Sequence, residues 1–384
     1  MTGRAEDDEE ELASRSKRGK RELEGINTGR AKRRETGQVC SVAILPLSLL
    51  SPRTCFRITI EMTSSKSPRR VMLVAYHLAK DTLPDYSSKF SRQDFTWPQL
   101  FACLVLKEFE KKDYRGAEQL LWDCPDLRRA IDLAKAPDHT TLHRAGKTLL
   151  SLPRAQKLLD RLIVFARACR VLGKTVALAA LDSSGYETRH ISSYFVRRRA
   201  KGGVAKNAEK TQEITYSRFP KLGIVADCAT HLVLSFWAGI GPGSDHGHFD
   251  DCLYHAWRRA TVRKLAADAG YDSEPNHQLA RSDMNVKTLI PALIGRRRKD
   301  GGPPSGRWRA VMAKLLRTKR GRRKSGYSQR WQSETVNSMM KRNAGSALRA
   351  RSDQARNREF ALRVLTHDLG ILKPRIATEQ VKCD

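Results

Sequence analysis

The alternation of hydrophobic and polar residues divides the chain into parts with different periods. Between about Trp97 and Leu172, apolar residues recur every three or four positions, which predicts short helices. From Thr175 onward, short apolar runs alternate with helical stretches, and such runs are typical of strands buried on both faces. Residues 1–61 carry neither period and pass from an acidic patch to basic clusters. We therefore expect a disordered charged arm over 1–61, with Met62 as an alternative start.

A signal for the start of a helix lies near the C-terminal end of the helical part. Asp138, or one of the threonines after it, suits the N-cap of a helix that contains the basic residues Arg144 and Lys147. Three short helices of which the last is basic are typical of a helix-turn-helix-like unit that binds DNA. Small helical bundles of other function share this pattern, so that alternative stays open. We predict a helical DNA-binding domain over residues 62–172.

The chain after residue 172 has the pattern of an α/β domain. The expected strands cover residues 175–181, 221–227 and 231–238, a short segment that ends at Asp268, and 286–293, with a helix over 249–262. A strand, two hairpin strands and then alternating helices and strands predict a mixed sheet flanked by helices. This domain is expected over 173–372, and a tail follows over 373–384.

Charge adds a partner to this picture. The 384 residues carry a formal net charge of +31, which favours a polyanionic partner, nucleic acid above all. A basic binding protein without chemistry fits the same composition. Residues 296–330 are dominated by Lys and Arg and hold Asp300 as their single acid. Within them, Arg322, Arg323 and Lys324 are expected to contact DNA phosphates.

Cysteine usage and hydropathy bear on metal sites and location. The eight cysteines form no C-x-x-C pair, so no structural zinc site is expected, and they are typical of reduced thiols in a cytoplasm. No apolar run approaches the roughly 20 residues that cross a bilayer. We expect a cytoplasmic, nucleoid-associated protein without a membrane partner.

Two aspartates follow predicted strands, where α/β sheets place ligand sites. Asp182 follows the apolar run from Thr175, and Asp268 follows the next predicted strand after the 249–262 helix. Taken singly, either residue is as readily a turn former or a helix cap. A third polar segment, residues 245–251, is either a metal site or a loop whose Asp and His residues cap a helix, and we favour the loop.

A stripe of four chemically distinct residues is predicted on one late helix. At 100° per residue, Tyr327, Arg330, Glu334 and Lys341 fall within an arc of about 60°. The stripe presents a ring, a guanidinium, a carboxylate and an ammonium together.

The opposite side of this predicted helix carries Val336 and Met340, which can face a core. An exposed salt-bridge stripe is the alternative, because Arg330 and Glu334 stand four residues apart. The residues alone leave both interpretations open.

Three motifs follow one another along the chain: Leu181-Asp182-Ser183-Ser184, Asp268-Ala269-Gly270-Tyr271 and Tyr327-x-x-Arg330-x-x-x-Glu334-x-x-x-x-x-x-Lys341. They resemble the segments around the first and second catalytic aspartates, and the Tyr-Arg-Glu-Lys signature, of bacterial insertion-sequence transposases of the DDE class. The resemblance covers roughly residues 95–370.

The resemblance implies a ribonuclease-H-like fold and a DNA transposase. Such an enzyme binds the terminal repeats of its own element, cleaves DNA with metal ions and transfers the strand to a target, commonly as a homodimer on paired ends. Two alternatives remain: an inactive DNA-binding protein on the same fold, and a metal-dependent nuclease without strand transfer. The three acidic residues of the motifs argue against the first alternative.

The resemblance also implies roles for the motif residues. Asp182, Asp268 and Glu334 would hold two Mg²⁺ ions, or Mn²⁺ in their place, with Asp182 as the bridging ligand. Carboxylates suit this task because Mg²⁺ prefers hard oxygen ligands, and paired metals stabilise the entering and leaving oxygens of a phosphodiester. The remaining signature residues would hold DNA phosphates near the cleaved bond: Tyr327, Arg330 and Lys341.

Overall fold

The computed structural model describes residues 66–188, 219–241, 243, 245–293 and 304–372, and the backbone of 56–59 and 377–380. All of these belong to one compact unit. Most of the expected arm over 1–61, most of the expected tail over 373–384 and the basic residues 296–300 lie outside the described residues.

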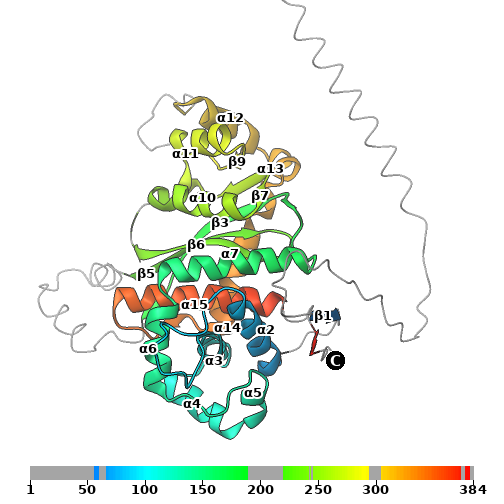
Figure 1. Ribbon diagram of the computed structural model, residues 1–384. Coiled ribbons are helices and arrows are strands. Elements are labelled where there is room, and N and C mark those ends of the chain that lie inside the picture. The colour runs from blue at the N-terminus through cyan, green and yellow to red at the C-terminus, as the bar shows by residue number, and fades with distance from the viewer. Residues whose placement is uncertain are drawn as a thin grey trace, which may run out of the picture. The chain divides into compact units, whose positions relative to one another are not determined.

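A five-stranded mixed sheet forms the centre of the fold, with the strand order β6-β5-β3-β8-β9 (Figure 1). Its strands are β3 (Ala179–Gly185), β5 (Phe219–Asp227), β6 (Val233–Gly241), β8 (Lys264–Ala267) and β9 (Lys287–Leu289). Strand β5 runs antiparallel to both β3 and β6, whereas β8 runs parallel to β3 and to β9. The predicted mixed sheet is confirmed.

The first strand differs from its prediction. Residues Thr175–Val176 form a separate short strand, β2, which pairs with β7 (Thr261–Val262). The central strand β3 begins only at Ala179, and it continues to Gly185 because its whole length pairs with β5. Asp182 therefore lies within a strand rather than after one. The pairing of β7 also ends the preceding helix earlier than predicted.

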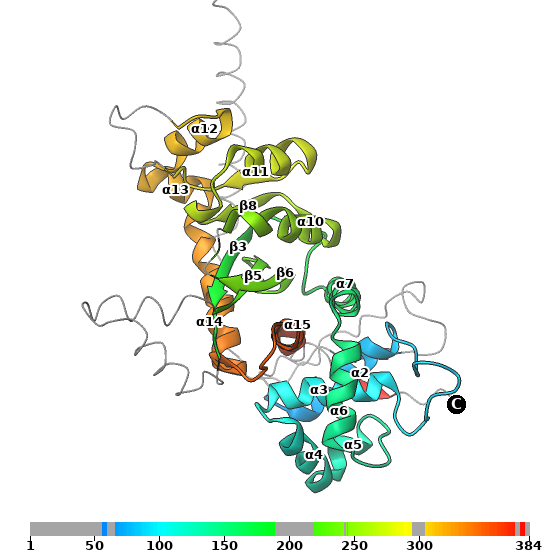
Figure 2. The same ribbon diagram turned by 90° about the vertical axis from the view of Figure 1, so that its left-hand side faces the viewer.

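Helices cover both faces of the sheet (Figure 2). Helix α10 (Phe249–Arg259) packs on β5 and β6 from one side. On the other side, α14 (Trp331–Ala344) packs on β3 and β5, and α15 (Asp353–Leu372) packs on β5 and β6. Beyond the β9 edge lie α11 (Glu274–Gln278), the π-helical turn Leu279–Asp283, α12 (Arg307–Leu316) and α13 (Lys319–Ser325).

The helical part before the sheet contains more helices than the three expected. They are α2 (Pro68–Lys80), α3 (Trp97–Phe109), α4 (Tyr114–Asp123), α5 (Pro125–Arg129), α6 (His139–Leu149) and α7 (Leu152–Ala168). Asp138 is the N-cap of α6, as predicted, and its carboxylate accepts hydrogen bonds from the backbone N–H groups of Thr140 and Thr141. None of the helices in the described part of the chain is long and apolar enough to cross a membrane.

Helix α15 joins the helical part to the sheet, and Figure 1 shows it between α3 and the sheet. It contacts α2, α3 and α7 of the helical part and β6 of the sheet. Its buried polar residues have partners on both sides: Arg363 forms an ion pair with Glu108 of α3 at 3.2 Å, and Asp368 accepts a hydrogen bond of 2.9 Å from the N–H of Val233. One hydrophobic cluster runs through the helical part, the sheet and α15, so the two parts share a core.

Besides β2 with β7, two further strand pairs lie apart from the main sheet. Strand β4 (Glu187–Thr188) pairs with β10 (Ala347–Leu348). Strand β1 (Phe56–Thr59) pairs antiparallel with β11 (Ala377–Gln380). The sequence pattern had predicted no strand in either of these last two segments.

Candidate functional site

The register of the sheet brings Asp182 and Asp268 together. Strands β3 and β8 run parallel, and Leu181 lies opposite Ala267. Asp182 is the next residue of β3 and Asp268 directly follows β8, and neighbouring strands lie about 4.8 Å apart. The backbones of these two aspartates, 86 positions apart in the sequence, thus lie next to one another at the same level of the sheet. Asp268 is exposed and begins the 3₁₀ turn Ala269–Tyr271.

Asp182 is held between the sheet and helix α14. Its carboxylate Oδ2 accepts a hydrogen bond of 3.2 Å from Nδ2 of Asn337 on α14. Burial raises the pKa of Asp182, against the opposing effects of the Arg330 guanidinium and of the Asn337 hydrogen bond. The site therefore holds a carboxylate whose charge is disfavoured by burial and supported by the nearby cations Arg330 and Lys341. A bound cation would remove that imbalance.

The predicted stripe is only partly one helix. Tyr327–Arg330 form a 3₁₀ turn, and α14 begins at Trp331. Three residues complete a 3₁₀ turn, so the angle of 100° per residue does not apply at Tyr327. From Arg330 onward the prediction is accurate, because Val336 and Met340 are 0% and 1% exposed and face the core.

Arg330 is the central cation of the stripe. Its Nη2 forms an ion pair with Oε1 of Glu334 at 2.5 Å. Burial alone would lower the pKa of Arg330, but Tyr327 and Glu334 outweigh it and raise the pKa. Burial also raises the pKa of Tyr327, which lies within electrostatic reach of both Arg330 and Asp268. The 3₁₀ turn therefore links the Asp268 side of the site to the Glu334 side.

Lys341 approaches the site from the far end of α14. Its Nζ lies 4.9 Å from the ring centre of Tyr186, which follows β3 and is buried. Burial lowers the pKa of Lys341, while Asp182 and Glu187 act in the opposite direction. The Tyr186 ring packs edge-on against Phe360 of α15, with 5.0 Å between the ring centres. The ammonium is thus placed by aromatic packing.

The carboxylates of Asp182, Asp268 and Glu334 suit a hard cation, but they do not converge on one point in the structure. Among the described residues, no three His, Cys, Asp or Glu side chains lie close enough together to hold a metal ion. Asp182 and Asp268 adjoin one another, whereas the Glu334 carboxylate is paired with Arg330 and its side chain is 54% exposed. A third carboxylate ligand would require Glu334 to leave Arg330.

The basic residues Arg322, Arg323 and Lys324 lie on α13, directly before the 3₁₀ turn. No residue of α13 is buried. Arg322 donates from Nε to the carbonyl oxygen of Leu316 at 2.8 Å, and none of the three forms an ion pair with a described residue. Their charge is available to a ligand near the Tyr327 side of the site.

A polar network occupies the opposite face of β3. Ser183 points away from Asp182, as neighbours on a strand do, and its Oγ donates to Oδ1 of Asp245 at 2.9 Å. Asp245 also pairs with Lys221 of β5. His248 shares a hydrogen bond of 2.9 Å with the Tyr271 hydroxyl, and its ring stacks on Trp237 with centres 4.3 Å apart.

This network corrects the expectation of capping residues in segment 245–251. His248 precedes α10 without a side-chain capping hydrogen bond, and Asp245 bonds to the sheet instead. The network connects the strand of Asp182 to the turn that follows Asp268, which ends at Tyr271. Sequence analysis missed it because Ser183 and Asp245 stand 62 positions apart. Sequence analysis also missed Asn337. A polar residue beside Val336, near the side of the helix that faces the core, could have indicated it.

Comparison with known proteins adds a family. Residues 177–369, slightly more than half of the chain, match a family model described as a transposase DDE domain. The match contains Asp182, Asp268 and Glu334. A search of curated proteins finds no significant match. The matching family implies a ribonuclease-H-like fold, and the mixed sheet flanked by helices agrees with it.

Proposed function

Because the chain belongs to the transposase DDE domain family, we propose that it binds the terminal repeats of its own element, cleaves the DNA at their ends and joins them to a target. The observation that carries this proposal is the register of β3 and β8, which sets Asp182 beside Asp268. Helix α14 packs on β3 and brings Glu334 to the same side. Carboxylates on two strands and one helix are the donors that phosphodiester chemistry with Mg²⁺ requires.

We propose that Asp182, Asp268 and Glu334 hold two Mg²⁺ ions, or Mn²⁺ in their place. When bound, such ions stabilise the entering and leaving oxygens of a phosphodiester. The raised pKa of Asp182 supports this assignment, since carboxylates with perturbed pKa values cluster at functional sites. Asp182 has the central position, between Asp268 on the neighbouring strand and the α14 residues.

Arg330 and Lys341 are proposed to hold the DNA backbone beside the cleaved bond. Arg330 has a carboxylate partner in Glu334, and a phosphate would compete for the same planar donors. Arrival of DNA would thereby release Glu334 toward Asp182. Lys341 acts as a point charge near Asp182, and Tyr327 borders the Asp268 side. On α13, Arg322, Arg323 and Lys324 would contact the backbone further along.

A nuclease that cuts without joining is the second candidate, because hydrolysis and joining use the same carboxylates. Strand joining also needs two ends held together, for which we propose a homodimer. An assay in which a cleaved end is offered with an intact target plasmid separates the two activities. Joined products support the transposase, and cut ends without joining support the nuclease.

The carboxylate assignment is tested by three isosteric changes. Asp182→Asn, Asp268→Asn and Glu334→Gln should each keep end binding and lower cleavage in Mg²⁺ by roughly a thousandfold or more, equivalent to about 4 kcal/mol of barrier. Asp251→Asn is the matched control, since Asp251 is exposed on α10. A variant of the three that cleaves like the wild type would show that its residue is wrongly assigned.

A further inference from the structure

A groove of about 950 Å³ lies apart from the carboxylates, where the helical part meets the segment between α14 and α15. Its walls come from three places in the chain: residues 107–114, residues 143–150 of α6 and the stretch 349–362. Cations dominate the lining: Lys107, Lys111, Lys112, Lys147, Arg349, Arg351 and Arg358. We call this the basic groove.

The two acids that line the basic groove already have partners within the fold. Asp113 caps α4, where its Oδ1 accepts a hydrogen bond of 2.7 Å from the N–H of Gly116. Glu359 accepts from the N–H of Ala350 at 2.9 Å and pairs with Arg363 at 2.8 Å. These carboxylates therefore offset little of the positive charge that faces the groove.

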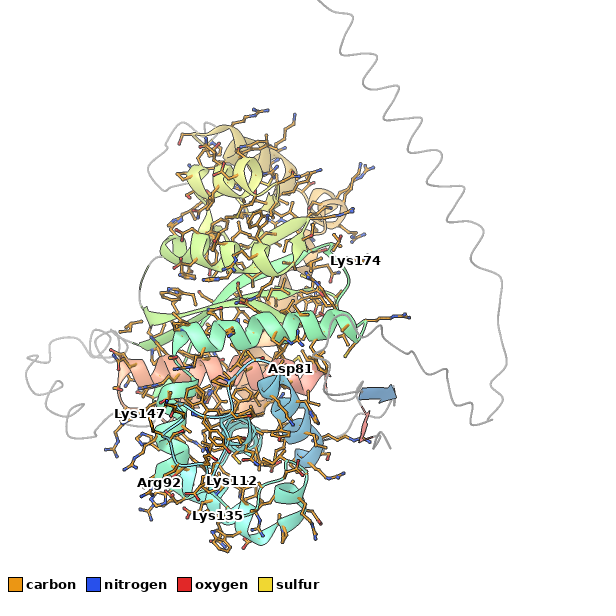
Figure 3. All side chains as sticks on the ribbon, viewed as in Figure 1. Asp81, Arg92, Lys112, Lys135, Lys147 and Lys174 are labelled. Atoms are coloured by element: carbon orange, nitrogen blue, oxygen red, sulfur yellow. The ribbon has the colours of Figure 1, made fainter. Side chains whose placement is uncertain are left out.

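Three cations of the groove are available to a ligand. Lys112, Lys147 and Arg351 are exposed, and none forms an ion pair with a described residue. Lys112 and Lys147 both lie on the helical part in Figure 3. They precede α4 and belong to α6 respectively, whereas Arg351 belongs to the segment after α14. Like charges converge here from three separate elements, which is unfavourable without a counter-anion.

The walls of the groove are hydrogen-bonded to one another and to the end of the helix that carries Glu334. Lys111 donates from Nζ to the carbonyl oxygen of Arg342 in α14 at 2.9 Å. Arg349 donates in turn to the carbonyl oxygen of Lys111. Glu334 and Arg342 are eight residues apart, which is about 12 Å along a helix. The groove is therefore a fixed feature at a short distance from the proposed cleavage site.

We propose that the basic groove binds the phosphate backbone of duplex DNA a few base pairs from the cleaved bond. This inference rests on the proposed function, and it adds a second DNA contact that the carboxylate site does not provide. The charge and the lining from three parts of the chain fit a run of phosphates. A free phosphate or nucleotide has the same chemistry, so the experiment must separate these two sources.

The test removes three charges from the full-length protein. Lys112→Gln, Lys147→Gln and Arg351→Gln are combined, and the matched control combines Lys157→Gln, Lys174→Gln and Lys287→Gln, three exposed lysines outside the groove. Binding of an end duplex and of an unrelated duplex is measured against salt concentration. Each lost phosphate contact should flatten the log–log slope by about 0.9. The groove variant should lose two to three such contacts, and its slope should flatten accordingly on both duplexes. The control variant should keep the wild-type slope.

The outcomes separate this inference from the proposed function. Wild-type protein that binds no DNA contradicts both. DNA binding with the same salt slope in wild type and groove variant overturns the groove alone. Inorganic phosphate, added at constant ionic strength, should leave DNA affinity unchanged. If the groove variant loses binding of inorganic phosphate but keeps the wild-type salt slope for DNA, the groove is a site for free phosphate and the proposal is wrong. Unchanged melting temperatures verify folding.

Discussion

At Asp182, a carboxylate is half-buried between a strand and α14, with a hydrogen bond from Asn337 and the cations Arg330 and Lys341 nearby. Burial raises its pKa, so its ionised form is less favourable in the folded protein than in the unfolded chain. A charge in such a position stabilises a ligand of opposite sign and destabilises the fold in that ligand's absence. Function and stability therefore oppose one another at this residue.

This conflict between function and stability at Asp182 predicts how the stability of the fold changes with pH. Since the folded pKa of Asp182 is raised, its contribution is most favourable below the unfolded pKa and declines as pH rises through the folded value. Asp182→Asn should therefore raise the melting temperature of the metal-free protein at pH 7, and the gain should shrink toward pH 4. Thermal unfolding of both proteins across this range measures it. A variant that melts below the wild type at pH 7 contradicts this account.

Arg330, directly before α14, and Glu334, in the first turn of α14, form a pair of opposite charges that can be interpreted in two ways. An exposed pair between Arg330 and Glu334 contributes at most about 1 kcal/mol to stability, and reversing it should matter little. If Glu334 holds metal and Arg330 holds phosphate, reversal places a cation at the metal site and an anion against the DNA backbone. Both positions face away from Val336 and Met340, so the fold should tolerate the exchange.

The double variant Arg330→Glu with Glu334→Arg should keep its melting temperature within a few degrees and lose cleavage and strand transfer, by roughly a thousandfold or more. Lys341→Ala serves as the comparison and should be milder, because it removes one phosphate contact and no metal ligand. Both are measured on a labelled end duplex in Mg²⁺. Cleavage by the reversed protein would reduce the pair to an ordinary surface salt bridge.

Periodicity predicted elements well where neighbours in sequence decide the structure. The Asp138 cap, the buried side of α14 and most strands of the sheet follow from spacings of two to four residues. Strand pairing does not, because β3 extends to Gly185 by pairing with β5, where its partner Lys221 is 36 positions away. The same limit hid the Ser183–Asp245 bond and the split between β2 and β3. The adjacency of Asp182 and Asp268 was predicted only in outline, since register is a property of two strands.

For the whole molecule, the shared core makes the helical part and the sheet one folding unit. Helix α2 contributes Val71, Met72 and Val74 to the cluster that continues through α15 into the sheet. The expected charged arm contributes only the pair of β1 with β11 to the described structure. Among the described residues, the core thus starts at Val71.

A chain that begins at Met62 should therefore fold and bind element ends, with unfolding free energy within about 1 kcal/mol of the full chain. A chain that begins at Trp97 lacks α2 and should lose at least about 3 kcal/mol, because several fully buried side chains are removed. Chemical denaturation of all three proteins makes the comparison. Loss of folding in the Met62 chain would show that the arm is structural.

The bond between Lys111 and the end of α14 has a consequence for where DNA is cut. If the basic groove holds a DNA backbone, α14 fixes the distance between that backbone and Glu334. The eight positions from Glu334 to Arg342 span about 12 Å, or about three to four base pairs of duplex. The distance between the bound backbone and the cleaved bond would then be set by the length of a helix, and not by the bases at the element's ends. Mapped cuts on ends of different sequence should fall at one constant offset from the protected backbone.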